Sequence, residues 1–186
     1  LTPAFFVLLL VQQRRWGAVC IAAFTFLCTV ATGFAEVVDA QHFWADAIFS
    51  TGRIGADDNP GAQSIRQVLA RADADSTALW LLVAAAVTAL ALLASRRAPA
   101  PLAVSFIGMT ACLVSPFSWF HHWVWVVPML AWVYTRWGPI VLALFMVPYA
   151  ATNISSGLVQ VPGLLFILVP VGFMLWYALR PSPSRP

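Results

Sequence analysis

Apolar residues in this chain of 186 residues gather in long runs that are separated by short polar connections. A helix needs about 20 apolar residues to cross a bilayer. The pattern predicts an all-α, polytopic transmembrane helix bundle with about six spans, because runs near that length occur at residues 17–35, 77–95, 100–117, 122–135, 139–152 and 161–179.

A seventh apolar run, residues 3–11, is about half a span long and predicts a partial amino-terminal span. Arg14 and Arg15 follow this run, and no Met precedes it. A secretory signal peptide carries its positive charges before the apolar stretch. We therefore expect the run to be the end of a helix that starts outside the chain. Residues 1–186 are predicted to form a single membrane domain that is a fragment of a longer chain.

Composition supports this class. Hydrophobic residues make up 61% of the chain, charged residues 9%, and the mean hydropathy is +0.85. A soluble domain of this size does not have such a composition.

The charges are distributed unevenly along the chain. Seven acids and three arginines lie in the connection 36–76, so this loop is net −4 and the remainder of the chain is net +7. Because cytoplasmic connections carry an excess of arginine and lysine, we expect loop 36–76 to be extracytoplasmic. Alternation of the spans then places residues 115–122 and 153–160 on the same face. The sequence predicts a multi-pass plasma-membrane protein whose active face is extracytoplasmic.

The remaining arginines are dispersed at helix ends, where membrane lipids with anionic headgroups would meet them. This pattern does not indicate nucleic-acid binding. The arginines outside loop 36–76 are Arg14, Arg15, Arg96, Arg97, Arg136, Arg180 and Arg185.

Loop 36–76 contains two helical patterns. Glu36, Asp39, His42 and Asp46 recur at helical spacing, which would suit a divalent cation, but the favoured interpretation is a helix end emerging into water. The acidic pair at residues 57–58 also has a simpler interpretation as solvated turn residues. We therefore predict no metal site.

The second pattern, residues 64–71, predicts a short amphipathic helix on the outer leaflet. It would either hold lipid or phosphate near a site or cap the spans, and the sequence leaves both alternatives open.

The most distinctive segment is residues 115–128, which places His121 and His122 among three tryptophans. Ser115-Pro116 should end or kink the preceding helix. Adjacent helical residues diverge by about 100°, so at least one imidazole should face protein or water. Ionisable groups at the mouth of a membrane segment indicate a functional site. The alternative is an interfacial pair that anchors a helix end.

Two segments together resemble a known family. They are Gln-Ser-Ile-Arg at residues 63–66 and Ser-Pro-Phe-Ser-Trp-Phe-His-His-Trp-Val-Trp at residues 115–125. With Thr2-Pro3 and Arg14-Arg15, they resemble the carboxy-terminal half of glycosyltransferase family 87. The resemblance implies a GT-C membrane fold. It also implies transfer of mannose, or arabinofuranose in some members, from a polyprenyl-phosphate donor to a lipid-anchored glycan acceptor, without a cofactor.

The resemblance also implies roles for particular residues. His121 and His122 would stabilise the departing phosphate, and the catalytic carboxylate would lie in the part of the protein that precedes this chain. Substrate contacts would come from Gln63, Ser64, Arg66, Ser118, Trp119 and Trp123.

Two other classes remain as alternatives. A transporter would need ionisable residues deep in several spans, and residues 77–95 and 161–179 contain no charged residue between their ends. A non-catalytic scaffold would leave the polar loop and the histidine pair unexplained.

Overall fold

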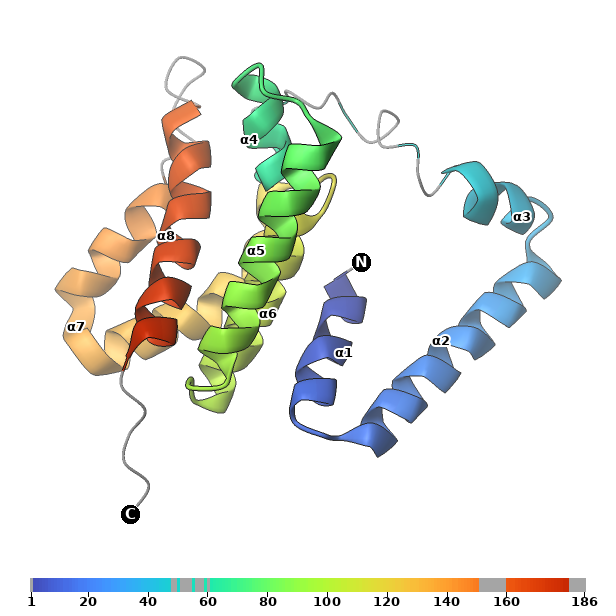
Figure 1. The fold of residues 1–186 in the computed structure, drawn as a ribbon, viewed down its shortest axis with the longest axis horizontal. Coiled ribbons are helices and arrows are strands. Elements are labelled where there is room, and N and C mark those ends of the chain that lie inside the picture. The colour runs from blue at the N-terminus through green and yellow to red at the C-terminus, as the bar shows by residue number, and fades with distance from the viewer. Residues whose placement is uncertain are drawn as a thin grey trace.

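The chain forms a bundle of helices, which Figure 1 shows in a computed structural model that describes residues 2–47, 50, 55, 59, 61–150 and 160–180. The α-helices are α1 (Thr2–Gln12), α2 (Trp16–Glu36), α3 (Ala40–His42), α4 (Ile65–Arg71), α5 (Thr77–Ser95), α6 (Ala100–Val114), α7 (Val126–Ala150) and α8 (Gln160–Leu179). A π-helix, η1 (Phe43–Ala47), follows α3, and a 3-10 helix, η3 (Phe120–Trp125), precedes α7. The prediction of an all-α membrane bundle is confirmed.

Three of the described helical stretches are long and apolar enough to cross a membrane. They are Trp16–Glu36, Thr77–Ser95 and Phe120–Val147. Shorter apolar helices cover Pro3–Gln12, Ala100–Val114 and Leu164–Leu179. The chain is therefore a membrane protein.

The structure differs from one of the predicted spans. Helix α6 ends at Val114, before Ser115-Pro116, because proline disfavours helical geometry in the residue before it. The predicted spans 122–135 and 139–152 correspond to η3 with the first part of α7 and to the second part of α7. Gly138 separates the two helical parts at a kink, with φ +82° and ψ −178°, a conformation that favours glycine.

Helix α6 lies at the centre of the bundle. Twelve of its 15 residues are buried, and it packs against α1, α5, α7, α8 and η3. Its polar side chains have partners inside the protein. The hydroxyl of Thr110 donates to the carbonyl of Phe106 at 2.7 Å, and the hydroxyl of Ser105 donates to the carbonyl of Trp125. The helix therefore brings hydroxyl groups into an apolar core without leaving them unpaired.

Helix α2 has a different environment. None of its residues is buried, and its contacts with other described elements are with α1 and α3. Figure 1 shows it standing away from α5 to α8. Its exposed side chains, which include Ile21, Phe24 and Leu27, give a surface that lipid can cover.

Packing between α6 and η3 leads to a first prediction. A β-carbon on Gly108 would lie 2.7 Å from Cβ of Trp125, closer than real β-carbon contacts. We expect Gly108→Ala to destabilise the protein by about 1–3 kcal/mol, because Trp125 has to move out of a packed core. The measurement is the thermal unfolding midpoint in detergent.

Gly17→Ala is the matched control, since nothing lies within 4 Å of a β-carbon at that helical position. Alanine there should be neutral or stabilising by about 0.5–1 kcal/mol. Equal midpoints for the two variants would contradict the packing at Gly108.

Candidate functional site

Two segments that are distant in sequence lie side by side at one end of the bundle. We call them the 61–67 segment and the 115–125 strip. The strip connects α6 to α7 and departs from α-helical geometry. Irregular backbone at membrane depth is tolerated only where protein or a wet cavity satisfies its polar groups. The 61–67 segment supplies that protein surface.

The backbones of the two segments pair directly. Ala62 and Trp119 form an antiparallel β-bridge. The N–H of Gln63 donates to the carbonyl of Ser118 at 2.6 Å. These contacts fix the start of α4 against the strip.

Side chains add further hydrogen bonds. The indole N–H of Trp123 donates to the carbonyl of Gln63 at 3.2 Å, and Nε2 of Gln67 donates to the carbonyl of Pro116 at 2.7 Å. Ser64 caps α4 by accepting from the N–H of Gln67 at 3.5 Å, and its hydroxyl donates to Oε1 of the same glutamine. Each bond joins a residue of the 61–67 segment to the strip or to the start of α4.

The loop before α4 is held by Arg71. Its Nη1 donates to the carbonyls of Asn59 and Ala62, both at 2.9 Å. A β-carbon on Gly61 would lie 3.1 Å from the Trp119 ring, so the backbone approaches this indole closely. The position of Trp119 therefore depends on glycine in the facing segment.

The two histidines lie at the exposed side of this assembly. Their ring centroids are 4.6 Å apart with an interplanar angle of 77°, and the His121 ring stacks on Trp119 at 6.5 Å and 11°. Both side chains are exposed. The backbone of His122 is held from two sides: its N–H donates to the carbonyl of Trp119 at 2.9 Å, and the thiol of Cys112 donates to its carbonyl at 3.3 Å. Two imidazoles are thus presented to the surroundings from a fixed backbone.

The structure brings most of the sequence-predicted site residues together. Gln63, Ser64 and Ser118 are each 1% exposed or less, so they hold the strip from inside. Trp123 is also buried. His121, His122 and part of Trp119 form the accessible side of the same assembly.

Arg66 points elsewhere on α4. Its guanidinium carbon lies 5.6 Å from the centroid of the Trp80 ring of α5. The residue is half-buried, and this contact orients its side chain toward α5.

Sequence reasoning missed Gln67 and Arg71 as residues that position the strip. Gln67 carried a signal: Ser64 and Gln67 have the S-x-x-Q spacing of a capping box, in which the first and fourth residues bond at a helix start. Arg71 carried none, because its acceptors are backbone carbonyls of a loop.

The predicted acidic helix face in loop 36–76 is not continuous. Helix α2 ends at Glu36, the chain turns, and Asp39 precedes α3. His42 and Asp46 lie 3.9 Å apart with side chains 69% and 74% exposed. Among the described residues, no three His, Cys, Asp or Glu side chains are grouped to hold a metal ion. Residues 57–58 and 153–159 lie outside the described residues.

The helix predicted at 64–71 is present as α4, with Ser64 as its N-cap. Gln67, which the amphipathic pattern placed on the polar side, is fully buried instead.

The bond from Gln67 to the strip leads to a second prediction. Gln67→Leu removes the donor to the half-buried carbonyl of Pro116, which costs about 1–3 kcal/mol. We expect the strip to open more often, so that the buried thiol of Cys112 reacts with a maleimide at least about tenfold faster. The assay uses a background in which the exposed Cys20 and Cys28 are replaced by serine.

Gln41→Leu is the control, because Gln41 is exposed on α3. The same labelling rate in the two variants would show that Gln67 does not hold the strip.

The fold and site define a polytopic membrane protein with a polar, histidine-bearing site at one end of its bundle. Residues 1–116 match the model of glycosyltransferase family 87. The match covers more than half of the chain, which therefore belongs to this family. It includes the 61–67 segment and ends just inside the 115–125 strip.

Curated relatives agree with the family. The chain is 29% identical over 208 residues to a polyprenol-phosphate-mannose-dependent alpha-(1-2)-phosphatidylinositol pentamannoside mannosyltransferase of Mycobacterium tuberculosis (strain CDC 1551 / Oshkosh), covering 96% of this chain and 48% of the relative. It is 34% identical over 145 residues to a polyprenol-phosphate-mannose-dependent alpha-(1-2)-phosphatidylinositol mannoside mannosyltransferase of Mycolicibacterium smegmatis (strain ATCC 700084 / mc(2)155), covering 70% of this chain and 33% of the relative. The chain thus spans at most about half the length of these relatives. No solved structure matches it.

Proposed function

We propose that this chain is part of a membrane mannosyltransferase that moves mannose from a polyprenyl-phosphate donor to a lipid-anchored glycan at the extracytoplasmic face. Membership of glycosyltransferase family 87 and the mannosyltransferase activity for which the relatives are named support the reaction class. The observation that supports the location of the site is the exposed His121–His122 pair, whose backbone is held by the 61–67 segment. By analogy with the relatives' names, the acceptor would be a phosphatidylinositol mannoside.

The proposed chemistry assigns different tasks to this chain and to the rest of the protein. A sugar transfer needs a carboxylate to accept the proton of the attacking hydroxyl, and we propose that this base lies outside the present chain. The transfer also needs hydrogen-bond donors or positive charge where the departing phosphate gains charge. The two imidazoles suit that task, because each can donate a ring N–H to a phosphate oxygen.

Other residues would act around this pair. Trp119 presents an aromatic face on which His121 stacks, and it would keep that ring oriented. Arg66, on the α5 side of α4, would add positive charge for the phosphate of the lipid donor. Gln63, Ser64, Ser118 and Trp123 would act on substrate indirectly, by holding the strip.

A third prediction tests the histidines in the full-length protein. His122→Ala or His121→Ala should lower transfer of radiolabelled mannose from polyprenyl phosphate by about two to three orders of magnitude, as loss of a charge-stabilising donor does in other enzymes. The assay uses membranes that contain equal amounts of each variant.

His42→Ala is the matched control, because this third histidine is exposed and pairs with Asp46. We expect it to keep transfer within about twofold, since it removes no donor from the proposed phosphate site. Wild-type rates in both single variants of the pair would refute the proposed role while leaving the reaction class intact. No transfer by the wild-type protein would refute the reaction class itself.

A fourth prediction tests the face of the membrane. Asp75 and Arg96 are exposed residues at the two ends of α5. In intact cells, an impermeant thiol reagent should label Asp75→Cys and should label Arg96→Cys only after lysis, in a background that lacks Cys20 and Cys28. The reverse pattern would invert the proposed topology.

A further inference from the structure

Three arginines from separate connections converge at the end of the bundle opposite the histidine pair. Arg97 follows α5, Arg136 precedes the bend in α7, and Arg180 follows α8. Nη1 of Arg97 donates to the carbonyl of Arg180 at 2.8 Å and to the carbonyl of Ala178. Arg97 thereby joins the α5–α6 turn to the end of α8.

Aromatic residues of α8 support these side chains. The guanidinium carbon of Arg180 lies 3.4 Å from the Trp176 ring centroid and 5.1 Å from that of Tyr177. Arg136 directly precedes Trp137, whose ring packs against that of Trp176. The segment of α7 that carries Arg136 therefore contacts the end of α8.

Trp137 extends the aromatic support, with its ring centroid 5.3 Å from that of Trp176. Indole rings favour the boundary between hydrocarbon and headgroups. This end of the bundle thus has interfacial aromatics directly beneath clustered positive charge.

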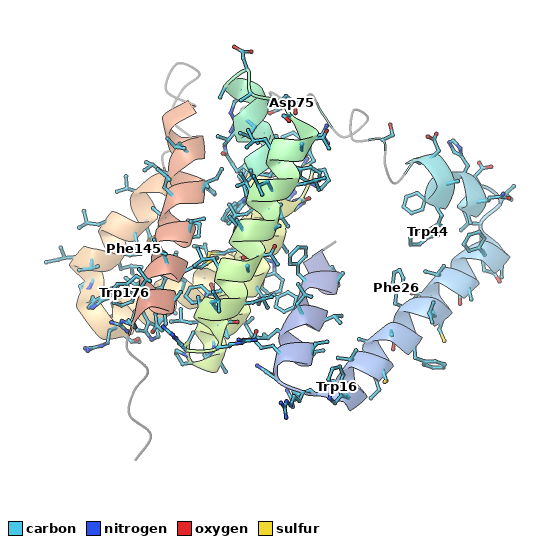
Figure 2. All side chains as sticks on the ribbon, in the orientation of Figure 1. Trp16, Phe26, Trp44, Asp75, Phe145 and Trp176 are labelled. Carbon is cyan, nitrogen blue, oxygen red and sulfur yellow. The ribbon has the colours of Figure 1, made fainter. Side chains whose placement is uncertain are left out.

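All seven acids of the chain occur between residues 36 and 75, in the sequence before α5. Figure 2 shows one of them, Asp75, and Trp176 toward opposite ends of the bundle. Within the described ranges, the ion pair that forms is His42–Asp46. Like charges that converge repel one another, and an anion between them would relieve that repulsion.

We propose that Arg97, Arg136 and Arg180 bind the phosphate of an anionic membrane phospholipid, with Trp137 and Trp176 beneath its headgroup. The side chains of Arg97 and Arg136 are exposed and that of Arg180 is half-buried, so a headgroup can reach them. A guanidinium donates two parallel N–H bonds to phosphate oxygens, which suits this ligand better than a neutral headgroup.

The excess of arginine in cytoplasmic connections explains why each of these three arginines is present. It does not account for the convergence of three connections on the end of one helix. That convergence arises from the bend of α7 and from the Arg97 bonds to α8. The lipid would bind α5, α7 and α8 at once and would stabilise their arrangement.

The experiment titrates the purified full-length protein in neutral detergent with phosphatidylglycerol, phosphatidylcholine or inorganic phosphate, and measures bound lipid by native mass spectrometry. We expect Arg136→Gln/Arg180→Gln to weaken phosphatidylglycerol binding about 30-fold, roughly fivefold for each arginine. The matched control is Arg14→Gln/Arg15→Gln, which removes the same charge from another basic pair. It should change binding by less than twofold.

Three results would overturn the proposal: equal weakening in the control, equal binding of phosphatidylcholine, or displacement of the lipid by inorganic phosphate at equal concentration. The last would identify a site for free phosphate. If the double variant does not fold, Arg136→Gln alone removes one exposed charge and should weaken binding about fivefold; unchanged binding in this variant would also refute the site.

Discussion

The backbone N–H and C=O groups of the 115–125 strip need hydrogen-bond partners, and the rest of the structure depends on this constraint. This strip leaves helical geometry next to α6, the most buried helix of the bundle, and its polar groups have little water to bond. The 61–67 segment meets the requirement through the backbone bond from Gln63 to Ser118 and the side-chain bond from Gln67 to Pro116. The position of α4 and the exposure of the histidines both follow from that pairing.

This arrangement separates residues that hold the site from residues that face outward. Gln63, Ser64 and Ser118 are buried and bonded within the protein, so they contribute rigidity. His121 and His122 lie on the outer side of the same backbone and are accessible. A transfer reaction needs groups that are already oriented when charge develops on the leaving phosphate. A rigid strip with exposed imidazoles meets that condition.

The two ends of the bundle differ in chemistry. One end carries Asp75 and the histidine pair, and the other carries arginines above a cluster of indole and phenol rings. Opposite ends of a membrane protein meet different surroundings, so each set of charges contacts different ligands. Helix α2 is the exception to compact packing, with no buried residue, and it leaves a large apolar surface beside the site-bearing bundle.

The apolar runs by themselves determined the class of fold and most helix positions, because burying backbone in lipid requires long helices. Local signals also located α4 and the break after Val114, since an amphipathic pattern and a Ser-Pro pair act within a few residues. The resemblance to glycosyltransferase family 87 placed Gln63 and Ser118 among the candidates, and the adjacent histidines added His121.

Tertiary structure alone decided which segments meet. Periodicity could not show that Gln67 holds the strip through a carbonyl 49 residues away, or that Arg71 holds the loop before α4, because their acceptors are backbone carbonyls that carry no sequence identity. It also left open that Arg97, Arg136 and Arg180 come together. These features depend on long-range packing around α6, which local residue patterns do not encode.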